Sequence, residues 1–86
     1  MNEHVLVSMN TRLEVAIEQR DINQIADIVG FYLKNKGSVV SYNELDVSLY
    51  LFWKSKNAFF LDVNKNDDEA FTRLEPIFER LDDYFW

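Results

Sequence analysis

The acidic side chains near the C-terminal end are the groups of this sequence with the clearest capacity for chemistry. Within the last 20 residues there are seven carboxylates and two arginines, which accounts for five of the six net negative charges of the chain. The seven are Asp67, Asp68, Glu69, Glu75, Glu79, Asp82 and Asp83. Carboxylates at this density can bind a cation, act in pairs as acid and base, or contact a basic surface.

The spacing of these carboxylates favours contact with a basic surface. A helix turns about 100° per residue, so most of them share one side, with Trp86 projecting beside them. Since one turn rises about 5.4 Å, such a row can imitate the regular negative charge of a nucleic-acid backbone. The candidate protein-binding residues are Asp68, Glu75, Glu79, Asp82, Asp83 and Trp86. We call this set the acidic stripe. The alternative is a solvated helix face with a frayed end at Trp86.

The other types of chemistry lack the residues that they require. His4 is the only histidine and there is no cysteine, which excludes a thiol nucleophile, a disulfide and a Cys-based zinc site. The segment from Asn64 to Glu69 has the composition of a calcium loop without its central glycine or its ligand spacing. Gly30 and Gly37, the two glycines, cannot form a phosphate-binding loop. We therefore expect no enzyme activity, no catalytic residues, no metal and no cofactor.

Length and composition limit the number of domains, the classes of partner and the cellular compartment that we expect. A chain of 86 residues with 48% hydrophobic residues is expected to fold as a single domain, 1–86. An isoelectric point near 4.6 argues against direct binding of nucleic acid or of an anionic membrane. The absence of cysteine, of a signal sequence and of a long apolar run fits a cytoplasmic protein.

Apolar residues recur at spacings of three and four in the first 35 residues and predict two helices. The first helix is expected to end near Arg20. Asp21 can cap the second helix, with Gln24 three positions later, and the second helix is expected to end near Asn35 with Gly37 as its stop. A junction this short predicts a helical hairpin.

The centre of the chain changes to a period of two. Apolar residues alternate from Leu45 to Trp53, and Ala58 to Val63 is a second β-prone run after a polar loop at 54–57. We therefore predict an α+β fold with two N-terminal helices, a central β-hairpin and a C-terminal acidic amphipathic helix. The aromatic residues of the hairpin are expected in the core or in a dimer interface. They are Tyr50, Phe52, Trp53, Phe59 and Phe60.

The last helix is expected to start at an Asp67 N-cap. Its predicted apolar face consists of Ala70, Leu74, Ile77, Phe78, Leu81 and Phe85. Pro76 lies inside this segment and predicts either a kinked helix or a division into two helices.

One stretch suggests a different structure for the centre of the chain. Residues 33–45, LKNKGSVVSYNEL, resemble the helix end, short strand and N-cap of the winged-helix DNA-binding domains of response regulators. The resemblance implies a capping box of Ser41 and Glu44 and a helix, rather than a strand, over Leu45 to Trp53. No basic recognition helix follows it, and we assign the chain to no family.

These features predict a small acidic noncatalytic protein-binding module. The expected function is that of an inhibitor or regulator, of the antitoxin, immunity or phage-inhibitor type, that occupies a basic surface of another protein, for example one that binds nucleic acid. The alternative is a structural or assembly subunit that forms a homodimer through its aromatic hairpin.

Overall fold

Helices account for the regular structure in the described part of the chain. The computed structural model describes residues 2–38, 43–64 and 68–86, with all their side chains except those at 38, 64, 68, 70 and 71. The elements are α1 (Glu3–Gln19), α2 (Ile22–Lys34), a short 3-10 helix η1 (Lys36–Ser38), α3 (Glu44–Lys54), α4 (Lys56–Asn64) and α5 (Asp68–Phe85). Because these ranges contain no strand, the predicted α+β fold with a central β-hairpin is wrong, and the fold is all-α.

The predicted helical hairpin of α1 and α2 is confirmed, and its turn has a specific chemistry. Arg20 adopts the left-handed conformation, with φ of 57°, and its N–H donates to the Ile17 carbonyl at 3.2 Å. The next N–H, that of Asp21, donates to the Ala16 carbonyl at 2.9 Å, which completes a Schellman motif. The Asp21 carboxylate then accepts from the Gln24 N–H at 3.2 Å and starts α2.

The end of α2 lies where the sequence predicted it, but a different residue closes it. The helix stops at Lys34, and the Asn35 side-chain amide donates to the Phe31 carbonyl at 2.8 Å. Gly37 lies beyond this cap, inside η1, and does not adopt a positive φ. The helix therefore ends on an asparagine side chain and not on a left-handed glycine.

Residues 44–54 form α3 because a helical arrangement buries their largest apolar residues together. Leu45, Leu49 and Phe52 follow one another at spacings of four and three and are at most 3% exposed. Val47 and Leu51, which a strand would place on the same face as Leu45, are 39% and 61% exposed. The alternation was therefore a chance property of a helix whose buried stripe is narrow.

Start and stop signals around α3 agree with the helix. The Asn43 side-chain oxygen accepts from the Asp46 N–H at 3.0 Å, so Asn43 is the N-cap. At the other end, the Ser55 hydroxyl donates to the Phe52 carbonyl at 2.9 Å, and the Ser55 carbonyl accepts from the Phe59 N–H at 2.9 Å. The predicted hairpin loop at 54–57 is thus a one-residue joint between α3 and α4.

The second predicted strand is helical and forms α4, because burial along it follows a helical period. Phe59 and Val63, four residues apart, are 6% and 7% exposed, whereas Leu61 between them is 70% exposed. The helix over 45–53 agrees with the alternative that the winged-helix resemblance implied. Ser41 of that alternative and the predicted Asp67 N-cap lie outside the described residues.

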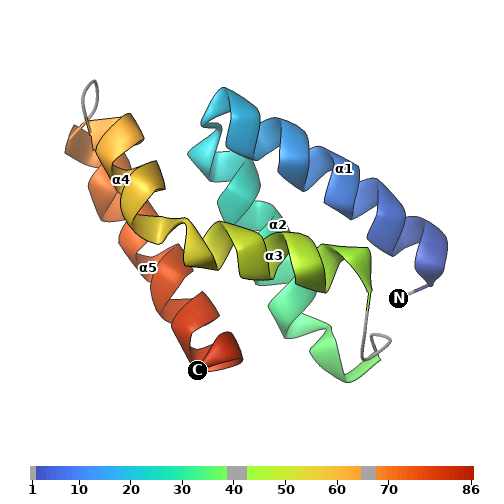
Figure 1. Cartoon of the computed structure of the whole chain (residues 1–86). Helices are drawn as coiled ribbons and strands as arrows, with labels where there is room; N and C mark the ends of the chain where they lie inside the picture. Colours follow the sequence, from blue (N-terminus) through green and yellow to red (C-terminus); the bar gives the residue numbers. More distant parts are fainter. Residues whose placement is uncertain (1, 39–42, 65–67) are drawn as a thin grey trace.

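α5 contacts three of the other helices, α2, α3 and α4. α1 lies against α2 and α3, both α2 and α3 contact α5, and α4 runs alongside the first half of α5 (Figure 1). Large residues that are completely buried join these helices, and each contributes about 1.5–3 kcal/mol through burial. Those at 0% exposure are Leu13, Ile25, Val29, Tyr32, Leu45, Leu49, Leu74 and Leu81.

The predicted apolar face of α5 is confirmed for the residues whose side chains are described, from Leu74 onward. Pro76 lies inside α5, so the segment is one helix and is not divided. Proline at this position lacks the N–H that would donate to the Thr72 carbonyl, and its ring crowds that carbonyl.

Replacing Pro76 with alanine is expected to stabilise the protein. Pro76 is exposed, so the change restores a helical hydrogen bond without opening a cavity, and the free energy of unfolding should rise by up to about 3 kcal/mol. Urea unfolding of the wild type and Pro76→Ala measures this difference. Glu75→Ala, at the neighbouring exposed position, is the control and should change stability by less than about 0.5 kcal/mol. An unchanged Pro76→Ala midpoint would show that the proline carries no such cost here.

Candidate protein-binding surfaces

The acidic stripe survives in the structure as a smaller surface than the sequence predicted. Glu75, Glu79 and Asp83 are exposed on α5, and Trp86 is 99% exposed just after the helix ends. Asp68 is the first residue of α5, and its side chain is not described. Three carboxylates and one tryptophan therefore remain available on this face.

Asp82 is half-exposed, and its carboxylate also makes contacts within the fold. Its Oδ1 accepts from the Trp53 indole N–H at 2.5 Å, and its Oδ2 lies 3.9 Å from the Lys56 ammonium. The carboxylate thereby ties α5 to α3 and α4. A substitution at Asp82 would disturb this junction, so Asp82 is unsuitable as a test of surface binding.

The aromatic residues that were assigned to a hairpin pack between α3, α4 and α5. Phe52 stacks on Phe78 with ring centroids 4.8 Å apart, and Phe59 meets Phe52 edge-on at 5.0 Å. Phe85 lies 5.4 Å from Trp53 and 5.5 Å from Tyr50. Because these rings lie on helices, the aromatic hairpin predicted to form a homodimer is wrong, and self-association itself stays a prediction.

A polar network that the sequence did not reveal joins α2, α3 and α5. The hydroxyls of Tyr32 and Tyr84 each donate to Asp46 Oδ1 at 2.6 Å, and the Asn43 amide donates to the Tyr32 hydroxyl at 3.1 Å. The Lys36 ammonium sits 4.1 Å from the centroid of the Tyr84 ring. Burial, and then the hydrogen bond to the Asp46 carboxylate, raise the pKa of both tyrosines, so that they remain donors. The network has the properties of a structural junction.

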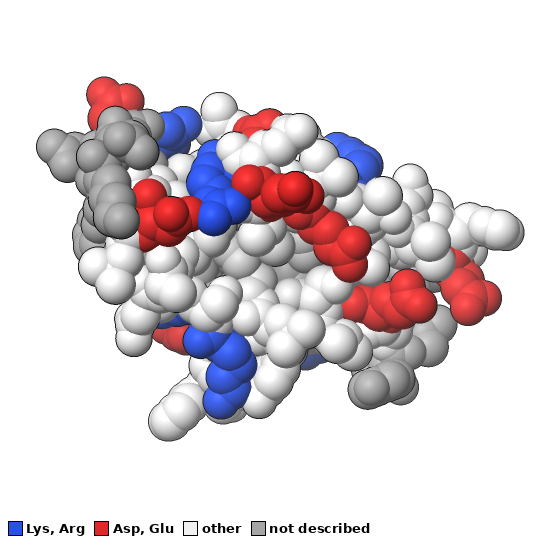
Figure 2. Space-filling view, turned by 45° about the horizontal axis from the view of Figure 1, so that its top comes forward, with Lys and Arg blue, Asp and Glu red and all other residues white. Residues whose placement is uncertain are grey.

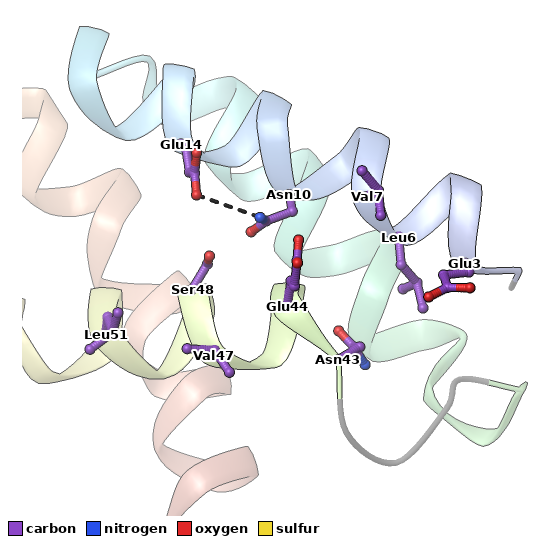
Figure 3. Close-up of a pocket in the computed structure, with 10 residues that line it drawn as sticks. All are labelled: Glu3, Leu6, Val7, Asn10, Glu14, Asn43, Glu44, Val47, Ser48 and Leu51. Atoms are coloured by element: carbon purple, nitrogen blue, oxygen red, sulfur yellow. Dashed lines mark hydrogen bonds between the residues drawn. The ribbon is translucent and has the colours of Figure 1, made fainter.

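A groove of about 800 Å³ lies between α1 and α3 (Figure 3). Leu6 and Val7 contribute apolar walls from α1, and Val47 and Leu51 contribute them from α3. Three glutamates also line it: Glu3, Glu14 and Glu44. On the face that Figure 2 shows, carboxylates form a band across the surface, and a basic side chain interrupts this band between two groups of them.

Asn10 stands at the floor of this groove with an unusual lack of partners. It is 9% exposed, and its Oδ1 has no hydrogen-bond partner among the described residues. Its amide nitrogen makes one long hydrogen bond, 3.5 Å, to Glu14 Oε1. Sequence reasoning missed Asn10, although a polar residue between Met9 and Leu13 on a buried helix face was a usable signal.

The described residues contain no group of three or more His, Asp or Glu side chains placed to hold a metal ion. None of the described helices combines the length and apolar character that crossing a membrane requires. Comparison with models of protein families, with curated proteins and with solved structures finds no match. We therefore infer a function from the surfaces of this chain.

The tyrosine network is expected to make stability fall at alkaline pH. The raised pKa of Tyr32 and Tyr84 means that the unfolded chain loses these protons above a pH of about 10 while the folded chain retains them, which favours unfolding. Tyr84→Phe should lower the free energy of unfolding by about 1–2 kcal/mol near neutral pH. Between about pH 8 and pH 11, the free energy of unfolding should fall less in Tyr84→Phe than in the wild type. Urea unfolding at both pH values measures this. Tyr50→Phe removes a hydroxyl outside the network and is the matched control; equal pH dependence of wild type and Tyr84→Phe would contradict the prediction.

Asn10→Leu is expected to raise stability. The substitution removes a buried oxygen without a partner, loses only the long hydrogen bond to Glu14, and should increase the free energy of unfolding by about 1 kcal/mol. Thermal and urea unfolding measure the change. Ser8→Leu, on the exposed side of α1, controls for the added hydrophobicity. A marked loss of stability in Asn10→Leu would show that the asparagine is needed by the fold.

Proposed function

We propose that this protein is a noncatalytic, cytoplasmic protein-binding module, an inhibitor or regulator of the antitoxin, immunity or phage-inhibitor type. Its α5 occupies a basic, nucleic-acid-binding surface of another protein. The observation that supports the proposal most strongly is the combination of Glu75, Glu79 and Asp83 with Trp86, which is 99% exposed. An exposed tryptophan beside carboxylates can serve as an anchor inside a ring of charge contacts.

The charges and the tryptophan have separate tasks in this proposal. The carboxylates attract a basic partner over distances of about a Debye length, so they accelerate association and lose influence as salt rises. Trp86 is buried only in the complex, so it slows dissociation. Self-association remains a separate prediction.

The test removes charge from α5 and leaves the fold contacts in place. Glu75→Gln with Glu79→Gln keeps the shape of both exposed side chains, and Glu18→Gln with Asp27→Asn removes the same charge from exposed positions on α1 and α2. Affinity capture from lysate of the native host identifies the partner by mass spectrometry. Association and dissociation rates are then measured with the purified partner at low and high salt.

The expected result separates these variants. The Glu75 and Glu79 variant should associate roughly tenfold more slowly at low salt, and the control should associate as the wild type does. Trp86→Ala should retain the association rate and dissociate roughly tenfold faster. Equal rates for wild type and both α5 variants would rule out this face as the contact surface.

A further inference from the structure

The groove between α1 and α3 has the dimensions of a docking site for one helix. Its lining on α1 runs from Glu3 to Glu14, which corresponds to about 16 Å of helix, or three turns of an incoming helix. Apolar side chains that line it are already partly exposed: Val7 at 47%, Val47 at 39% and Leu51 at 61%. An apolar groove between two neighbouring helices is a common binding site for a third helix.

The charges of the groove specify the chemistry of its occupant. Glu3 and Glu14 lie along α1 and Glu44 lies on α3, whereas the described lining contains no Lys or Arg. The ion pairs Arg20–Asp62 and Lys56–Asp82 involve none of these glutamates. An apolar groove whose charged residues, among those described, are all acidic is complementary to an apolar stripe flanked by basic side chains.

The polar groups inside the groove point the same way. Asn10 is 91% buried, and its Oδ1 accepts no hydrogen bond within the described chain. Figure 3 shows Glu44 and Ser48 directed from α3 toward α1, on the same side as Asn10. The Glu44 carboxylate and the Ser48 hydroxyl therefore offer acceptors to an occupant that brings N–H donors, whereas Asn10 Oδ1 is itself buried.

We propose that the groove between α1 and α3 binds one basic amphipathic helix of a protein partner. The apolar stripe of that helix lies on Val7, Val47 and Leu51. Its Lys or Arg side chains meet Glu3, Glu14 and Glu44. The site uses none of the α5 residues of the proposed function, so each of the two surfaces can fail without the other.

The experiment uses a phage-displayed library of random peptides of about 16 residues, long enough for four helical turns, selected on the folded full chain. Enriched peptides are synthesised and titrated into ¹⁵N-labelled protein. We expect a consensus with apolar residues at i, i+3 or i+4, and i+7, flanked by Lys or Arg. Shift changes should centre on Asn10, Val47 and Leu51.

Matched variants decide where and how these peptides bind. Val47→Arg places a positive charge in the groove, which repels a basic peptide, and should weaken peptide binding at least roughly tenfold. Leu61→Arg makes the same kind of change at an exposed position on α4 and should leave peptide binding unchanged. Glu14→Gln with Glu44→Gln should weaken binding and reduce its salt dependence.

Several outcomes would overturn the proposal. They are a selection that enriches no peptide, enriched peptides without basic residues, and binding that Val47→Arg leaves intact. Loss of binding in the Glu75→Gln and Glu79→Gln variant alone would move the basic ligand to α5 and support only the proposed function. A dimer in light scattering that Val47→Arg dissociates would make a second copy of this chain the occupant instead.

Discussion

The carboxylate of Asp46 is the point on which the arrangement of the helices depends. One of its oxygens accepts from Tyr32 of α2 and from Tyr84 of α5, while Asp46 itself belongs to the first turn of α3. An apolar core is tolerant of small rotations and shifts, because its contacts have little direction. Two short hydrogen bonds to one atom fix the three helices relative to one another, and the hydrophobic side chains then fill a space of defined shape. Both surfaces proposed for binding depend on this geometry, since α5 carries one of them and α3 carries a wall of the other.

Sequence reasoning succeeded where local chemistry decided the structure. The Asp21 cap, the end of α1 at Arg20 and the apolar stripe of α5 each depend on residues within a few positions of one another. It failed at residues 45–63, where alternation suggested strands. There the pattern Leu45, Leu49 and Phe52 fitted a helix equally well, and only burial against α1 and α5 distinguishes the two. Asn43, a good N-cap residue three positions before Asp46, was the local signal that favoured the helix.

The candidate surfaces show the same limit. A helical wheel places Glu75, Glu79 and Asp83 on one face, but it cannot reveal that Asp82 is held by Trp53, which lies 29 residues earlier in the chain. The groove between α1 and α3 could not be predicted at all, because it is a relation between two helices whose pairing was unknown. Asn10 gave a hint, since a polar residue on an apolar helix face calls for a partner.

The last turn of α5 determines how Trp86 meets its surroundings. The preceding residues are held from within: Tyr84 is hydrogen-bonded to Asp46, and the Trp86 N–H donates to the Asp82 carbonyl at 2.9 Å. The indole is therefore completely exposed on a backbone that is already ordered. Contact with it restricts two side-chain torsions and leaves the main chain as it was. A bulky aromatic ring presented in this way is a preorganised contact residue, and burying it against a complementary surface costs little conformational entropy.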